Sequence, residues 1–274
     1  MDNVNDFFAT LSSFLWGWPM IVLLLGTHVF LTIRLRFPQR KLFTAIRLSV
    51  QRDKSQKGDV SQFGALATAL AATIGTGNII GVATAVALGG PGAVFWCWLT
   101  GVFGISTKYS EALLAIKYRV KSERGTMQGG PMYTLERGLG WRWMGFLFAL
   151  FTAIAAFGIG CTVQANAIST IMHASYGIST EVSGVVLMLL AAAVIVGGVR
   201  SISKVCSMLV PLMALLYVVG CIYILCGNSD YVMPALKLIV SSAFSPEAAG
   251  GGFAGGSVIM AARYGIARGL FSNE

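Results

Sequence analysis

The feature that most constrains this chain is a series of long stretches without a charged residue. They lie at Phe7–Ile33, Ser61–Thr107, Trp143–Met172, Val182–Val199 and Val205–Gly227. A helix of roughly 20 apolar residues crosses the hydrocarbon core of a bilayer, which is about 30 Å thick. The second stretch is long enough for two helices, because Gly89-Gly90-Pro91-Gly92 interrupts it with turn residues. The pattern predicts six membrane-spanning helices and a weaker seventh at about Gly252–Gly269.

The composition agrees with a membrane protein and excludes other classes. Only 11% of the 274 residues are charged and 55% are apolar, whereas a soluble domain carries roughly a quarter charged residues. An ordinary soluble globule, a disordered chain and a secreted disulfide scaffold are therefore excluded. The five cysteines lie inside apolar stretches without C-x-x-C spacing, so they predict buried small residues and no zinc-type metal site.

The positive charge follows the spacing of the predicted spans. With the N-terminus outside, 19 of the 20 Lys and Arg residues fall on the cytoplasmic side, and Lys237 alone falls outside. Eight of them lie between Arg34 and Lys57, and seven between Lys108 and Arg142. Arg263 and Arg268 are counted at the cytoplasmic end of the seventh span. The positive-inside rule thus predicts a multi-pass protein with its N-terminus outside, and it explains the net charge of +9 without nucleic acid as a partner.

The second predicted span contains Gly75-Thr76-Gly77-Asn78 near its middle. Glycine weakens a helix by about 1 kcal/mol relative to alanine, and Asn and Thr need polar partners inside a bilayer. One interpretation is a discontinuous helix, whose free N–H groups meet an anion and whose carbonyls meet a cation. The other is close helix packing, because Gly77 and Gly81 form a G-x-x-x-G pair. The spacing leaves both interpretations open.

Polar residues elsewhere in the spans are few. No Asp or Glu occurs inside the second, fourth, fifth or sixth span, which favours sodium over proton coupling, because proton relays usually need carboxylates or histidines. Gln164 in the fourth span either points at a substrate or hydrogen-bonds a neighbouring helix. The sequence contains no clustered His or Asp and no G-x-S-x-G motif, so we do not expect an enzyme.

Four segments resemble the alanine or glycine:cation symporter family: Ala65–Trp96, Met127–Gly140, Val163–Ile168 and Glu247–Glu274. The resemblance covers the whole chain. It implies a protein of the bacterial or archaeal cell (inner) membrane that couples sodium entry to the uptake of alanine or glycine. Its partners are then alanine or glycine, sodium and the lipid bilayer, and no cofactor is expected apart from sodium as the coupling ion.

The same resemblance implies an all-α integral membrane protein with the leucine-transporter architecture of two inverted five-helix repeats. Residues 1–274 then form a single transmembrane domain. Residues 7–33 are an extra N-terminal helix, 61–227 the complete first repeat, 228–250 an extracytoplasmic loop, and 251–274 the first helix of the second repeat.

The resemblance also implies the site. The substrate-binding residues are then Gly75, Thr76, Gly77, Asn78, Phe157, Gln164, Ser257 and Met260. The unwound segment from Gly75 to Asn78 meets the substrate carboxylate. The backbone carbonyls of Ala71 and Ile74 contribute to a sodium site that a later helix completes.

The chain ends at Glu274, directly after a predicted span. We therefore expect an N-terminal fragment, truncated after the seventh helix, that does not transport by itself. The alternative is a non-transporting membrane scaffold or channel subunit that pairs with a second chain.

Overall fold

A computed structural model describes residues 6–7, 10–11, 14–15, 17–51, 59–123, 125–160, 162–244 and 258–272, with only the backbone at 18, 76, 77, 159, 160, 258–260 and 270–272. It divides into two compact units. Unit 1 comprises residues 1–41, 78–108 and 218–274, and unit 2 comprises residues 42–77 and 109–217. Each unit is described below by itself.

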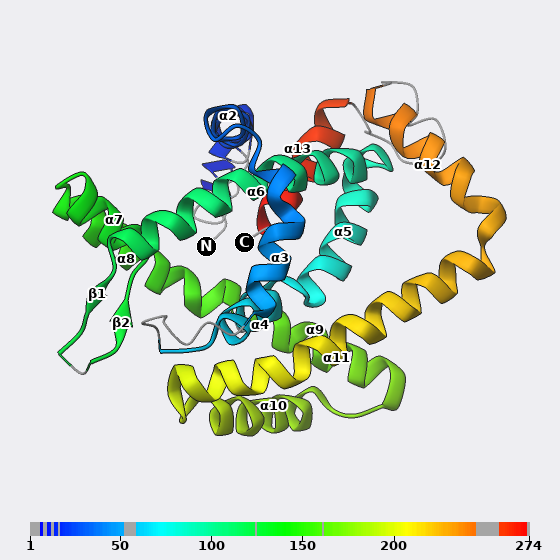
Figure 1. Ribbon diagram of the computed structural model, residues 1–274. Coiled ribbons are helices and arrows are strands. Elements are labelled where there is room, and N and C mark those ends of the chain that lie inside the picture. The colour runs from blue at the N-terminus through cyan, green and yellow to red at the C-terminus, as the bar shows by residue number, and fades with distance from the viewer. Residues whose placement is uncertain are drawn as a thin grey trace. The chain divides into compact units, whose positions relative to one another are not determined.

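The described chain is almost entirely helical, with one small hairpin (Figure 1). The α-helices are α2 (Trp18–Arg34), α3 (Leu42–Val50), α4 (Gln62–Thr73), α5 (Thr76–Gly89), α6 (Gly92–Lys117), α7 (Pro131–Gly138), α8 (Arg142–Ala155), α9 (Thr162–Tyr176), α10 (Thr180–Ile195), α11 (Gly198–Gly227), α12 (Ser229–Phe244) and α13 (Val258–Ser272). A 3₁₀ turn, η1 (Pro38–Lys41), follows α2, and a π turn, η2 (Ala156–Gly160), joins α8 to α9. Strands β1 (Val120–Lys121) and β2 (Met127–Gln128) pair antiparallel.

Helices lie where the uncharged stretches predicted membrane spans. Three helical segments of the described chain are both long and apolar enough to cross a membrane: Gln62–Gly89, Arg142–Tyr176 and Gly198–Gly227. A fourth counts if the bent pair Pro19–Arg34 and Pro38–Val50 is one span, and Thr180–Ile195 is a shorter apolar helix. The predicted turn between the second and third spans is confirmed, because Gly90 has φ of 75° and α6 begins at Gly92.

The region expected as a loop at 228–250 is mostly helix. Residues 229–244 form α12, which starts two residues after α11 ends and continues through Pro234. The remaining residues of that region, 245–250, lie outside the described ones, as does the glycine-rich run up to Ser257. The sequence analysis missed α12 because Asp230, Pro234 and Lys237 interrupt its apolar pattern.

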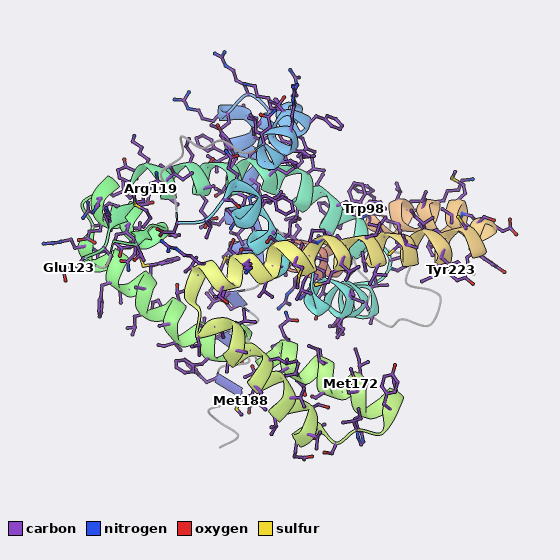
Figure 2. The ribbon with its side chains drawn as sticks, turned by 60° about the horizontal axis from the view of Figure 1, so that its bottom comes forward. Trp98, Arg119, Glu123, Met172, Met188 and Tyr223 are labelled. Carbon is purple, nitrogen blue, oxygen red and sulfur yellow. The ribbon has the colours of Figure 1, made fainter. Side chains whose placement is uncertain are left out.

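The burial pattern is the reverse of that of a soluble protein. Buried side chains are mostly small or hydroxyl-bearing, such as Ala93, Thr100 and Ser106, each of which is 0% exposed. Large apolar side chains lie on the outside, and those of Met188 and Tyr223 project from α10 and α11 (Figure 2). Small residues let helix backbones approach closely inside a bilayer, while lipid solvates the large apolar ones. This arrangement is typical of an integral membrane protein.

In unit 1, the turn after α2 is fastened to α6 by polar side chains. Gln39 Nε2 donates to the carbonyl oxygen of Val102 at 2.9 Å and to Ser106 Oγ at 3.0 Å. Thr32 Oγ1 lies 2.8 Å from Ser106 Oγ, and His28 Nδ1 lies 2.6 Å from Thr107 Oγ1. The side chains of His28, Thr32 and Ser106 are buried between the helices, where water does not replace their hydrogen bonds. The polar contacts therefore fix α2 against α6.

Helix α13 packs on α6 through two glycines four residues apart. A methyl group at Gly265 would overlap the carbonyl oxygen of Ala93 and lie 2.7 Å from Trp96 Cβ. One at Gly269 would lie 2.8 Å from Thr100 Cβ. This is the close approach that a G-x-x-x-G pair permits. Close packing was one interpretation of the same pattern at Gly77 and Gly81, whereas no packing role was predicted for Gly265 and Gly269.

In unit 2, α4 is held at its beginning and on its packed face. Ser61 caps the helix by accepting a hydrogen bond from the Gly64 backbone N–H at 3.0 Å. Gly64 is buried against Ser203 of α11. Asp59 Oδ2 accepts a hydrogen bond from the Met127 backbone N–H at 2.8 Å, which ties the segment before α4 to strand β2.

The start of α10 is also capped. Ser179 Oγ accepts a hydrogen bond from the backbone N–H of Val182. The pKa of Glu181, which precedes the predicted span, is lowered by its own backbone N–H and by the hydroxyls of Ser179 and Thr180. Ionised Glu181 thus stabilises the positive N-terminal end of α10.

Candidate functional site

The helix that contains Gly75-Thr76-Gly77-Asn78 is interrupted. Helix α4 ends at Thr73, Ile74 leaves the helical region with φ of −84° and ψ of 82°, and α5 begins at Thr76. Across the break, the Gly75 N–H donates to the carbonyl oxygen of Thr73 instead of to that of Ala71. The break itself agrees with the discontinuous-helix interpretation. Its position differs from the prediction, because only Gly75 of the four residues lies in the break and the other three form the first turn of α5.

A break of this kind presents groups of both signs at one place. The N–H groups in the first turn of α5 precede the repeating hydrogen bonds of that helix, and they form the positive end of its dipole. The last turn of α4 carries carbonyls of the opposite sign, that of Ala71 among them, and the carbonyl of Ile74 follows directly. An anion suits the first group and a cation the second. Among the described residues, no group of three His, Cys, Asp or Glu side chains could hold a metal ion.

Gln164 lies at the same break. It is the third residue of α9, and a methyl group built on Gly75 would lie 3.9 Å from its Oε1 atom and 4.0 Å from its Nε2 atom. Both residues belong to unit 2. The amide therefore brings one acceptor and two donors to the break. This position is compatible with contact to a substrate and with a hydrogen bond between helices, the two roles left open by the sequence.

The π turn η2 lies just before α9, and the sequence analysis missed it. It joins α8 to α9 over Ala156–Gly160, and the Thr162 hydroxyl donates back to the Gly158 carbonyl. Single π turns occur frequently at functional sites in helices. Two glycines followed by a threonine are the local signal that could have indicated it. Phe157 lies in this turn with its side chain 82% exposed, so it encloses no pocket within the described chain.

The residues expected on the seventh span are only partly described. Ser257 lies outside the described residues, and Met260 belongs to α13 with only its backbone described. Arg268 differs from expectation. It was counted at the cytoplasmic end of the span, but its guanidinium lies against Gly81 of α5, well inside the helix. The sequence missed this placement because it depends on how α13 packs.

Comparison with known proteins places this geometry in context. A model of the "Sodium:alanine symporter family" matches residues 1–274. The chain is 50% identical, over 99% of its length, to an "Uncharacterized transporter" of Haemophilus influenzae, and it spans 60% of that protein. It is 49% identical, over 97% of its length, to "Sodium/alanine symporter AgcS" of Methanococcus maripaludis, and it spans 59% of that protein. It is 37% identical, over 95% of its length, to "Probable sodium/glutamine symporter GlnT" of Bacillus subtilis, and it spans 54% of that protein.

Proposed function

Because the chain belongs to the sodium:alanine symporter family, we propose that it forms part of a sodium-coupled symporter for a small neutral amino acid, alanine or glycine. The protein acts in the bacterial or archaeal cell (inner) membrane and takes the amino acid into the cell. The chain spans about 60% of the length of the relatives with which it shares half of its residues. The proposal therefore concerns the whole transporter, to which this chain contributes the break between α4 and α5.

The break between α4 and α5 is the observation that carries the proposal. An amino acid brings a carboxylate and an ammonium group, and a symporter must bind a cation beside it. The N–H groups at the start of α5 suit the carboxylate, and the carbonyls of Ala71 and Ile74 suit sodium. Gln164 lies close enough to Gly75 to contact the same ligand. Asn78, Ser257 and Met260 remain candidates for contact with the substrate, whereas the exposed side chain of Phe157 does not support the role expected for it.

The architecture follows from the same family. We infer that α2 contains the extra N-terminal helix, that residues 61–227 form the first of two inverted repeats, and that α13 opens the second. The N-terminus lies outside, so that α4 starts in the cytoplasmic half of the membrane and α5 ends at the outer surface. The broken helix then has its break near the bilayer midplane, where an alternating-access transporter keeps its substrate site.

A cysteine at the break tests the proposal. In a background with the native cysteines replaced by serine, Thr76→Cys is labelled with a small maleimide in the whole transporter reconstituted in nanodiscs. We expect labelling to slow severalfold when sodium and alanine are both present, and little when either is alone, because the two ligands bind together. Glycine should substitute for alanine, and potassium should not substitute for sodium.

The matched control is Thr84→Cys, which lies two turns further along the same helix. Its labelling should not respond to either ligand. If labelling at Thr76→Cys is equally insensitive to sodium and to both amino acids, the chain belongs to a scaffold or channel subunit and the proposed function is wrong. If glutamine protects and alanine does not, the substrate assignment is wrong and the transport class stands.

A further inference from the structure

The packing of α13 leaves an arginine side chain pointing at the broken helix. Arg268 lies on α13, and a methyl group built on Gly81 of α5 would overlap its guanidinium group. Gly81 thus provides the space that the guanidinium occupies. On the other side, Gly265 and Gly269 hold α13 in van der Waals contact with α6. All of these contacts lie within unit 1.

Two helices give the same depth for this guanidinium. Gly81 lies eight residues before Gly89, the last residue of α5, which corresponds to about 12 Å along the helix. Thr100, which contacts Gly269 next to Arg268, lies eight residues after Gly92, the first residue of α6. With the turn between α5 and α6 at the outer surface, as proposed above, the charged group of Arg268 lies well inside a hydrocarbon core that is about 30 Å thick.

A cation in this position needs an anion. The Nε atom of Arg268 is buried and has no hydrogen-bond partner within the described residues, and no described Asp or Glu forms an ion pair with this side chain. An unpaired charge inside a bilayer costs several kcal/mol. The planar guanidinium is shaped to bind a carboxylate through two parallel hydrogen bonds. A carboxylate is therefore the group that fits.

We propose that Arg268 is a carboxylate-binding group inside the membrane, placed on α5 by the absence of a side chain at Gly81. Gly77 and Gly81 are four residues apart and lie on the same face of α5, so the guanidinium sits one helical turn from the first N–H groups of that helix. This inference rests on the proposed function, in which the carboxylate is that of the transported amino acid. A carboxylate side chain of the protein itself would supply the same chemistry from a second source.

The melting temperature of the protein in nanodiscs distinguishes the two sources of the carboxylate, the transported amino acid and a side chain of the protein. The ligands are alanine with sodium, propionate, which has a carboxylate and no ammonium group, and alaninol, which has an ammonium group and no carboxylate. All are compared in methanesulfonate buffer, with chloride as a separate addition. The variants are Arg268→Gln, Arg268→Lys and Gly81→Ala. The last of these keeps the arginine in the chain and displaces its guanidinium group. Arg263→Gln on the same helix is the matched control.

We expect alanine and propionate to raise the melting temperature of the unmodified protein, and alaninol to have no effect. Arg268→Gln and Gly81→Ala should lower the affinity for alanine and for propionate about tenfold or more. The loss of affinity should be smaller for Arg268→Lys and absent for Arg263→Gln. Since Gly81→Ala leaves the arginine in the chain, a folding failure of Arg268→Gln does not decide the result.

A carboxylate from the protein gives a different supporting result. Arg268→Gln then lowers the melting temperature without any ligand. The difference from the unmodified protein shrinks as the pH falls below about 4 and disappears below the pKa of the paired carboxylate, which the arginine lowers. The inference is overturned if Arg268→Gln behaves like Arg263→Gln in every condition, or if chloride alone produces the stabilisation. If alanine and sodium stabilise the protein equally with and without Arg268, and the melting temperatures without ligand are also equal, the proposed function stands and this inference fails. If propionate binds through Arg268 but alanine does not bind, this inference stands and the proposed function fails.

Discussion

Gly92 shows how single residues set the distance between helices in this protein. It begins α6, and a methyl group on it would lie 2.6 Å from the carbonyl carbon and oxygen of Ser242 and 2.7 Å from the nitrogen of Ala243. These are backbone atoms of α12, which cannot rotate aside. Trp96 Nε1 donates to the Ala243 carbonyl at 3.3 Å one turn further on. The contact therefore depends on glycine at this position.

Substitution of this glycine should separate the two helices. We expect Gly92→Ala to lower the stability of the protein in detergent by about 1–3 kcal/mol, the usual cost of overpacking, as measured by its melting temperature. Gly184→Ala on α10 is the control, because nothing lies within 4 Å of the added methyl group. That substitution should leave the stability unchanged or raise it, since alanine favours helix. Equal effects of the two substitutions would contradict the close contact at Gly92.

At the scale of elements, the end of α2 is an unusually constrained turn. Arg36 and Phe37 have φ of 56° and 58°, a left-handed conformation that costs residues with side chains roughly 1–2 kcal/mol each. The turn persists because the chain is held on both sides. The Phe37 N–H donates to the Thr32 carbonyl at 2.9 Å, and Gln39 then reaches back to α6. The side-chain amide of Gln39 thus offsets the unfavourable backbone conformation.

The donor group of Gln39 is the part that we expect to matter. Both Gln39→Ala and Gln39→Glu should destabilise the protein by about 1–3 kcal/mol, because each removes the two hydrogen bonds that the Gln39 amide donates to the Val102 carbonyl and the Ser106 hydroxyl. Hydrogen exchange at the backbone amides of η1 should increase in both variants. Gln51→Ala, at the exposed end of α3, is the control and should change neither measurement. Full stability of Gln39→Glu would show that the amide donor does not hold the turn.

At the scale of the whole molecule, the proposed orientation can be tested without any ligand. Glu123, at the tip of the β1–β2 hairpin (Figure 2), and Lys237, on α12, are both exposed and lie in regions predicted on opposite sides of the membrane. Single cysteines at these positions, in a background without the native ones, are treated with an impermeant maleimide. We expect Lys237→Cys to react in intact cells, and Glu123→Cys to react only after permeabilisation. The opposite pattern would reverse the orientation.

The sequence predicted the features that depend on neighbouring residues alone. Uncharged stretches predicted where helices form, because the transfer of apolar side chains into lipid is nearly additive along the chain. Gly89 to Gly92 predicted a turn, whereas Gly75 to Asn78 left open whether the second span is interrupted or closely packed. The exact break, at Ile74 and Gly75, was displaced from the prediction, because Thr76 and Asn78 can start a helix as readily as they can interrupt one.

The tertiary structure alone decided which of these segments meet. Gln164 comes to Gly75, the guanidinium of Arg268 lies on Gly81, and Gly265 seats α13 on α6. The pair Gly265 and Gly269 signals close packing but not the partner helix, and the other two contacts have no sequence signal, since each joins residues far apart in the chain. The sequence by itself determined that the chain is an integral membrane protein with a weakened second span. Packing decided what faces that span, because helices in lipid are positioned by close contacts and hydrogen bonds instead of by hydrophobicity.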